Sequence, residues 1–273
     1  MVDSNDHLGL VVSGMEEEQK NVDKQITQCR DSLFSLLGSA LSFKCKLAPV
    51  VQLHLWKTYS LPVLCSGLSA LPIRPTAMKP LQVFQQKILR GFLKLSPTSP
   101  VPAMFFLLGE LPIEATLHIN ILGLFYTILN NPQTKVFKIV AYIMKMADQK
   151  STTWSHHVRL LCLKYNLPDP LMLLGQPPMS KSSWKTLVKT RVTVFHENQQ
   201  RLKAKSNSKL TNFNVDLLGL AGAPHPAVQY IKVPQEAMKM RAHIKMLSGD
   251  FLSYEVLANE RGGWQSTLPA VHS

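Results

Sequence analysis

The sequence predicts a mainly α-helical protein, made of one or more helical bundles with a short β-strand remnant near its N-terminus. Three observations support this fold class. Apolar residues recur at helical spacing through most of the 273 residues, prolines and glycines divide these stretches, and a β-branched run typical of a strand stands near the start. Hydrophobic residues make up 45% of the chain, which is enough for a sizeable core.

The N-terminal segment predicts one strand followed by a helix. The run HLGLVVSG, from His7 to Gly14, is apolar and β-branched and ends at a glycine. A lone strand leaves its backbone groups without partners, so we expect its pairing partner to lie upstream and to be missing. Between Asn21 and Leu37 one apolar stripe at spacings of three and four predicts a helix; its members are Val22, Ile26, Cys29, Leu33 and Leu36.

The next elements are also expected to be helical. Pro49 suits the first turn of a helix over residues 48–61, because its missing N–H has no partner to lose there. Residues 61–73 predict a short buried helix or turn. Between Leu81 and Leu95 the pattern is amphipathic, with Leu81, Phe84, Ile88, Phe92 and Leu95 on one face and Lys87, Arg90 and Lys94 on another.

The proline-rich run SPTSPVP over residues 96–102 ends that helix. Residues 103–129 are apolar nearly all round, which predicts helices at the centre of a bundle. Further helices are expected over 132–147, 152–165, 234–248 and 250–260, and residues 181–209 form the most basic part of the chain. The tail from Arg261 shows no periodicity and is expected not to order.

The charge balance favours a polyanionic partner. The chain has 30 Lys and Arg residues against 17 Asp and Glu residues, a net charge of +13, and the first 31 residues hold seven of the acids. A strong positive excess favours nucleic acid, with an affinity that falls as salt rises. The alternative is a solvated basic surface without a specific partner.

The sequence lacks the local motifs of the common catalytic and metal sites. It has no adjacent pair of aspartates and no phosphate-binding glycine loop, HExxH or GxSxG motif. His156, His157 and Cys162 do not match a usual zinc spacing. The four cysteines (Cys29, Cys45, Cys65 and Cys162) are widely separated, which predicts reduced thiols. We therefore expect no enzyme activity, no cofactor, no metal and no small-molecule substrate.

One stretch is apolar enough to be considered as a membrane-spanning segment. Residues 115–134 carry no formal charge, but their apolar core is shorter than a span and suits a buried helix better. Asp3 and Asp6 argue against a secretory signal at the start. The expected location is the nucleus or the cytoplasm, with no membrane partner.

Several segments resemble the reverse transcriptases of non-LTR (LINE-like) retrotransposons. The runs HLGLVVSG, NVDKQITQCRDSLFSLLG and LSFKCKLAPVVQLHLWKTYSLPVLCSGLSALPI look like the segment that follows the palm. The run FQQKILRGFLKLSPTSPVPAMFFLLGELPIEATLHINILGLFY looks like the region that follows the thumb. The similarity extends from about His7 to about Glu260 and is most specific in its first half.

The resemblance implies a region of that family without its catalytic centre. The family's metal-binding aspartate pair and its endonuclease belong upstream, and its downstream zinc-knuckle-like element has no counterpart here. The expected division is a strand remnant of the palm–thumb junction over 1–18, a thumb-like helical domain over 19–96, a C-terminal helical region over 97–260 and a disordered tail over 261–273. The implied function is that of a catalytically inactive fragment.

By resemblance, a thumb would grip a template–primer duplex through its backbone, so duplex DNA or an RNA–DNA hybrid is the expected partner, bound without sequence preference. The candidate contacts are chosen by charge placement: Lys87, Arg90, Lys94, Lys44, Lys46, Lys57, Lys185, Lys189 and Arg191. The alternative function is a helical protein-interaction scaffold whose basic faces bind an acidic partner.

Overall fold

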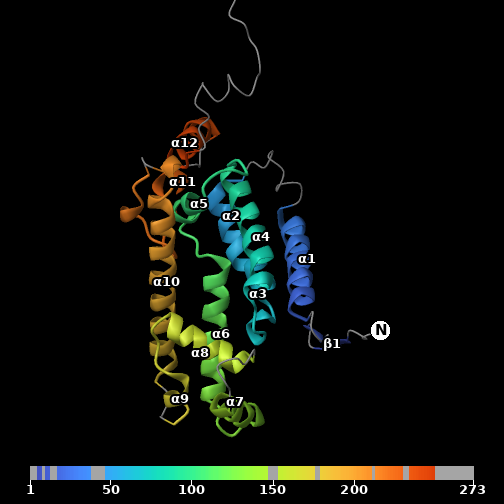
Figure 1. Cartoon of the computed structure of the whole chain (residues 1–273). Coiled ribbons are helices and arrows are strands. Elements are labelled where there is room, and N and C mark those ends of the chain that lie inside the picture. The colour runs from blue at the N-terminus through green and yellow to red at the C-terminus, as the bar shows by residue number, and fades with distance from the viewer. Residues whose placement is uncertain are drawn as a thin grey trace, which may run out of the picture.

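The computed structural model describes residues 5–7, 10–12, 17–37, 47–146, 153–175, 179–210, 213–229 and 234–249. These ranges confirm a mainly α-helical protein (Figure 1). Lys44 and Lys46, the helix expected over 250–260 and the tail from Arg261 lie outside the described residues.

The N-terminal β element is a hairpin. Strands β1 (Asn5–His7) and β2 (Leu10–Val12) pair antiparallel, with Asn5 opposite Val12. The sequence predicts one strand over His7–Gly14 with a missing upstream partner. In the structure His7 belongs to β1 and Leu10–Val12 form β2, so β1 pairs with one edge of β2 from within the chain.

Helix α1 (Glu17–Leu37) begins four residues before the predicted start. Its first turn carries acidic residues, which are favourable beside the positive end of the helix dipole. Because the apolar stripe does not extend into this turn, the apolar pattern does not indicate it. Val22, Cys29 and Leu33 of the predicted stripe are fully buried. They face α3 (Leu61–Cys65) and α4 (Pro75–Leu93), on which α1 packs.

The chain from Pro49 to Cys65 runs as α2 (Pro49–Leu55), a π-helical turn (Trp56–Ser60) and α3. Pro49 begins the first of these, as predicted. A 3₁₀ turn (Leu68–Ala70) leads to α4, which begins six residues before the predicted Leu81 and ends before Lys94.

Helices α5 (Val101–Leu108) and α6 (Ile113–Leu129) are the central pair, and most of their residues are buried, as the sequence predicts. Gly109 ends α5 with φ +58°, and a Cβ there would lie 2.7 Å from the carbonyl oxygen of Gly222. Only glycine fits this close approach without moving the backbone. Among the described helices none alone is long and apolar enough to span a membrane, whereas α5 and α6 together pass that test with a 60° bend between them.

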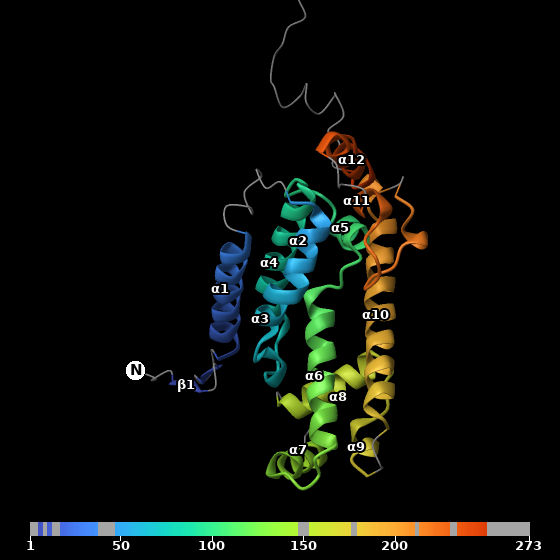
Figure 2. The same ribbon diagram turned by 180° about the vertical axis from the view of Figure 1, so that it is seen from behind.

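The remaining helices are α7 (Lys135–Met146), α8 (Trp154–Lys164), α9 (Pro170–Leu173), α10 (Lys181–Lys205), α11 (Pro226–Gln229) and α12 (Pro234–Leu247), with 3₁₀ turns at Ser208–Leu210 and Val215–Leu217. The expected helices over 132–147, 152–165 and 234–248 are therefore confirmed. Helix α10 lies along one edge of the molecule and α1 along the opposite edge in both views (Figures 1 and 2).

The described residues bury two hydrophobic clusters. The first joins α1 to α5 with Leu210, Phe213 and Ile244. The second lies among α6, α7, α8 and the first half of α10. Since α6 and α10 contribute to both clusters, they connect the two halves of the molecule. The first cluster contains residues from both sides of position 96, and the domain boundaries stay a prediction.

Candidate nucleic-acid interface and a buried histidine cluster

Helix α10 presents a row of lysines on its surface. Lys181, Lys185 and Lys189 are all exposed, and their spacing of four residues places them on one side of the helix. Within the part of the chain that the structure describes, none of the three side chains forms an ion pair or a hydrogen bond. We call this set the lysine row.

A row of hydroxyl groups runs beside the lysine row. Ser182, Thr186 and Thr190 each follow a member of the lysine row, so they lie about 100° further round the helix. All three are exposed and line a shallow hollow together with Ser183 and Leu187. Lysine ammonium groups and hydroxyl groups are both common donors to phosphate oxygens.

Arg191 does not join the lysine row. It is exposed, but it lies two residues after Lys189, which turns it by about 200° to the other flank of the hydroxyl row. Of the three candidates on α10, the structure therefore brings Lys185 and Lys189 together and places Arg191 apart.

Local contacts fix which face of α10 is buried and which face is exposed to solvent. Ser180 caps the helix by accepting a hydrogen bond from the backbone N–H of Ser183. Trp184 donates its indole N–H to the carbonyl oxygen of Leu122 at 3.1 Å and stacks on Tyr126. These contacts hold the buried face of α10 against α6, which leaves the lysine row facing outward.

The predicted row on α4 is not a row of equivalent surface charges. Lys87 is exposed, but Arg90 is only partly exposed and donates a hydrogen bond from Nη2 to the carbonyl oxygen of Ser99 at 3.1 Å. Lys94 lies beyond the last residue of α4 in a left-handed conformation with φ 54°. Arg90 thus helps to hold the proline-rich connection against α4.

Lys57 makes an internal ion pair. Its Nζ lies 2.8 Å from Oε2 of Glu110, whose side chain is 3% exposed. Burial raises the pKa of Glu110, whereas the charge of Lys57 and its hydrogen bond lower it. The physical role that the structure gives Lys57 is to compensate this buried carboxylate.

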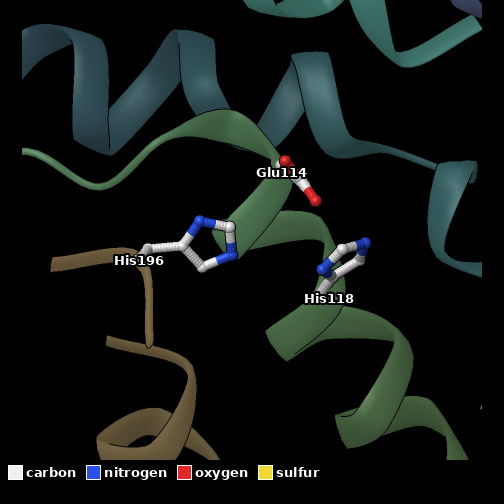
Figure 3. A group of neighbouring side chains, drawn as sticks. All are labelled: Glu114, His118 and His196. Carbon is white, nitrogen blue, oxygen red and sulfur yellow. The ribbon is translucent and has the colours of Figure 1, made fainter. Parts of the chain in front are cut away.

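A second group of residues, which local sequence patterns indicate only in part, lies at the junction of the two hydrophobic clusters. Glu114 and His118 are one turn apart on α6, and His196 comes from α10 (Figure 3). Their potential ligand atoms lie within 4.8 Å of one another, and both histidines are buried. We call these three residues the histidine cluster.

Tyr165 connects the two histidines. Its hydroxyl oxygen lies 2.5 Å from Nδ1 of His118 and 2.9 Å from Nε2 of His196. A phenol has one proton to donate, so it donates to one imidazole and accepts an N–H from the other. Glu114 is held from outside the cluster, by Lys164 at 2.7 Å and by Gln82 at 3.3 Å.

Burial keeps the two histidines and Tyr165 neutral at pH 7. Burial, with a smaller contribution from the charge of Lys164, lowers the pKa of His118 to about 2. Burial also lowers the pKa of His196 to about 4, although the charge of Glu114 acts in the opposite direction. Burial also raises the pKa of Tyr165 above its ordinary range. The two imidazoles therefore keep a lone pair each at neutral pH, and a metal ion can bind a neutral imidazole through it.

The histidine cluster opens onto a pocket of about 530 Å³ between the start of α4, α6 and α8. Glu114, His118, His156, His157 and Lys164 are among the residues that line it. Within the described part of the chain, Nδ1 of His156 and Nε2 of His157 are buried without a hydrogen-bond partner. Cys162, by contrast, lies in the second hydrophobic cluster, and burial raises its thiol pKa to about 12.

Part of this cluster is visible in the sequence. Glu114 and His118 stand four residues apart on a predicted helix, a spacing that places both on one face. His196 lies 78 residues further along the chain, and no local spacing indicates it.

Comparisons of this chain with protein-family models, with curated proteins and with solved structures find no match in any of the three.

Proposed function

We propose that this chain is a non-catalytic helical module that binds the phosphate backbone of duplex nucleic acid through the lysine row of α10. The resemblance to the post-palm region of non-LTR retrotransposon reverse transcriptases supports a partner of this kind. The proposal makes the chain a catalytically inactive relative of part of an RNA-directed DNA polymerase, with binding that does not read the base sequence.

The observation that carries the proposal is the combination of three exposed, unpaired lysines with the neighbouring hydroxyl row. Like charges four residues apart destabilise a helix by a few tenths of a kcal/mol per pair. Phosphate groups would relieve that repulsion between Lys181 and Lys185 and between Lys185 and Lys189. Contacts of this kind position a protein on a duplex but carry no sequence information.

A salt series tests the proposal. The logarithm of the binding constant for a mixed-sequence duplex should fall linearly with the logarithm of the salt concentration, with a slope of about −3 or steeper, since each lysine that neutralises one phosphate contributes about −0.9. Duplex DNA and an RNA–DNA hybrid should give similar slopes. An absence of binding at about 50 mM salt, or a binding constant that salt does not change, would contradict the proposal.

One observation favours the alternative, a scaffold for an acidic protein partner. Helix α7 exposes an apolar row at spacings of three, three and four residues, formed by Val136, Ile139, Tyr142 and Met146. Exposed lysines lie beside it at positions 135, 138 and 145. An acidic amphipathic partner helix would match this face. Such a partner would bind even if the lysine row were removed, which separates the two functions.

A further inference from the structure

We propose that the histidine cluster is a binding site for one divalent transition-metal ion, Zn²⁺ being the ion that its donor set fits. The ligands would be Nδ1 of His118, Nε2 of His196 and a carboxylate oxygen of Glu114. This inference does not depend on nucleic-acid binding.

The donor set decides the class of ion. Two imidazoles and one carboxylate suit zinc and its neighbours in the first transition row, whereas magnesium and calcium prefer oxygen ligands alone. The three donors come from two helices that pack directly on each other, α6 and α10 (Figure 1). Three protein ligands leave one coordination position open for water, and the pocket beside Glu114 and His118 gives a path to it.

The geometry needs only a local contraction. Zinc holds nitrogen and oxygen ligands at about 2.0–2.2 Å, so tetrahedral donors lie about 3.3 Å apart. The donors here lie within 4.8 Å of one another, and side-chain rotation on fixed helices can bring them closer. Gln85 fixes the start of α6, because its side-chain amide donates a hydrogen bond to the carbonyl oxygen of Leu111 and accepts one from the backbone N–H of Ile113, the first residue of the helix.

Two neighbouring groups compete with the ion. The hydroxyl of Tyr165 is hydrogen-bonded to Nδ1 of His118 and to Nε2 of His196. A metal ion must therefore displace this hydroxyl before it can bind the two nitrogens. The imidazole that donates its N–H must then move that proton to its other nitrogen. Lys164 places a positive charge 2.7 Å from Glu114, but its side chain is 31% exposed and can rotate into solvent.

Because Tyr165 and Lys164 compete with the ion, the proposal predicts some variants that weaken zinc binding and others that do not weaken it. Untagged protein is freed of metal with a chelator and titrated with Zn²⁺ against a chelating dye, with Co²⁺ as a spectroscopic probe and Mg²⁺ as a negative control. We expect one Zn²⁺ per chain, a visible Co²⁺ spectrum of a four-coordinate site, and a higher melting temperature with zinc because a ligand that binds the folded state stabilises it.

The variants divide into three classes. His118→Gln, His196→Gln and Glu114→Gln remove ligands and should weaken Zn²⁺ binding by more than the roughly 100-fold that a lost outer contact produces. His157→Gln is the matched control, because its ring centroid lies 6.0 Å from that of His118 and it supplies no ligand; its affinity should be unchanged. Lys164→Met and Tyr165→Phe remove competitors and should bind zinc at least as tightly as the unchanged chain.

Lys164→Met and Tyr165→Phe keep the proposal testable if a ligand variant fails to fold. An unchanged chain that binds no stoichiometric Zn²⁺, or a loss in His157→Gln equal to that in His118→Gln, would overturn the proposal. Loss of zinc binding in Tyr165→Phe would overturn the assignment of three ligands, because the phenol would then be one of them.

Discussion

Replacing Lys181, Lys185 and Lys189 together with alanine is expected to lower the affinity for duplex nucleic acid about 10³-fold at 50 mM salt. Each phosphate contact contributes about 0.9 to the salt slope, and the electrostatic contribution vanishes near 1 M salt. Three lost contacts therefore remove between three and four decades of affinity at 50 mM, and the slope should become shallower by about 3. Fluorescence anisotropy with a labelled duplex measures both quantities.

The matched control is the replacement of Lys135, Lys138 and Lys145 on α7 by alanine. It removes the same number of exposed lysines, so each variant changes the net charge from +13 to +10. If only overall charge matters, the two variants will lose equal affinity, and that result would contradict a contact surface on α10. Lys181 lies in the first turn of its helix, where a positive charge is unfavourable, so its loss should not weaken folding.

Replacing Lys57 with methionine is expected to destabilise the folded state by about 2–3 kcal/mol. Removal of one partner from a buried ion pair leaves the other charge uncompensated, and fully buried pairs lose 3–5 kcal/mol in this way. The expected value here is smaller because Lys57 is 40% exposed while Glu110 is 3% exposed, so water screens part of the interaction. Chemical denaturation of the single variant measures the loss.

The double variant Lys57→Met with Glu110→Gln should recover most of that stability, because it removes both charges together. The loss in the single variant should also depend on pH. Burial holds the folded-state pKa of Glu110 above its unfolded value, so the folded protein takes up a proton first as the pH falls, and the loss should shrink from neutral towards acidic pH. A loss that is independent of pH, or a double variant as unstable as the single one, would contradict the role given to Lys57.

Local patterns in the sequence are sufficient for the central helices and insufficient for the ionic contacts. Residues 103–129 are apolar nearly all round, and the structure buries most of them at the centre, where their apolar side chains are removed from water. The break between α5 and α6 follows from Gly109 and Pro112. The contact between Lys57 and Glu110 joins residues 53 positions apart, and charge placement alone made Lys57 a candidate for phosphate contact.

The candidate interface could be predicted only in part, because local sequence patterns indicate some of its features and not others. Helical geometry alone places Lys185 and Lys189 in one row and turns Arg191 away from it, so the grouping of these three residues could have been refined from the sequence. The use of Arg90 by the carbonyl oxygen of Ser99 depends on how the proline-rich connection folds back on α4, which no periodicity indicates. The histidine cluster likewise needs the packing of α6 on α10.

The most direct test of the central claim is chemical footprinting of lysines by acetylation, read by mass spectrometry with and without a bound duplex. The account predicts that duplex protects Lys181, Lys185 and Lys189, while Lys135, Lys138 and Lys145 react at the same rate in both samples. Two results would contradict it. One is protection of the α7 lysines in place of those on α10. The other is that each of the six lysines reacts equally fast with and without duplex, at a salt concentration where the duplex is bound.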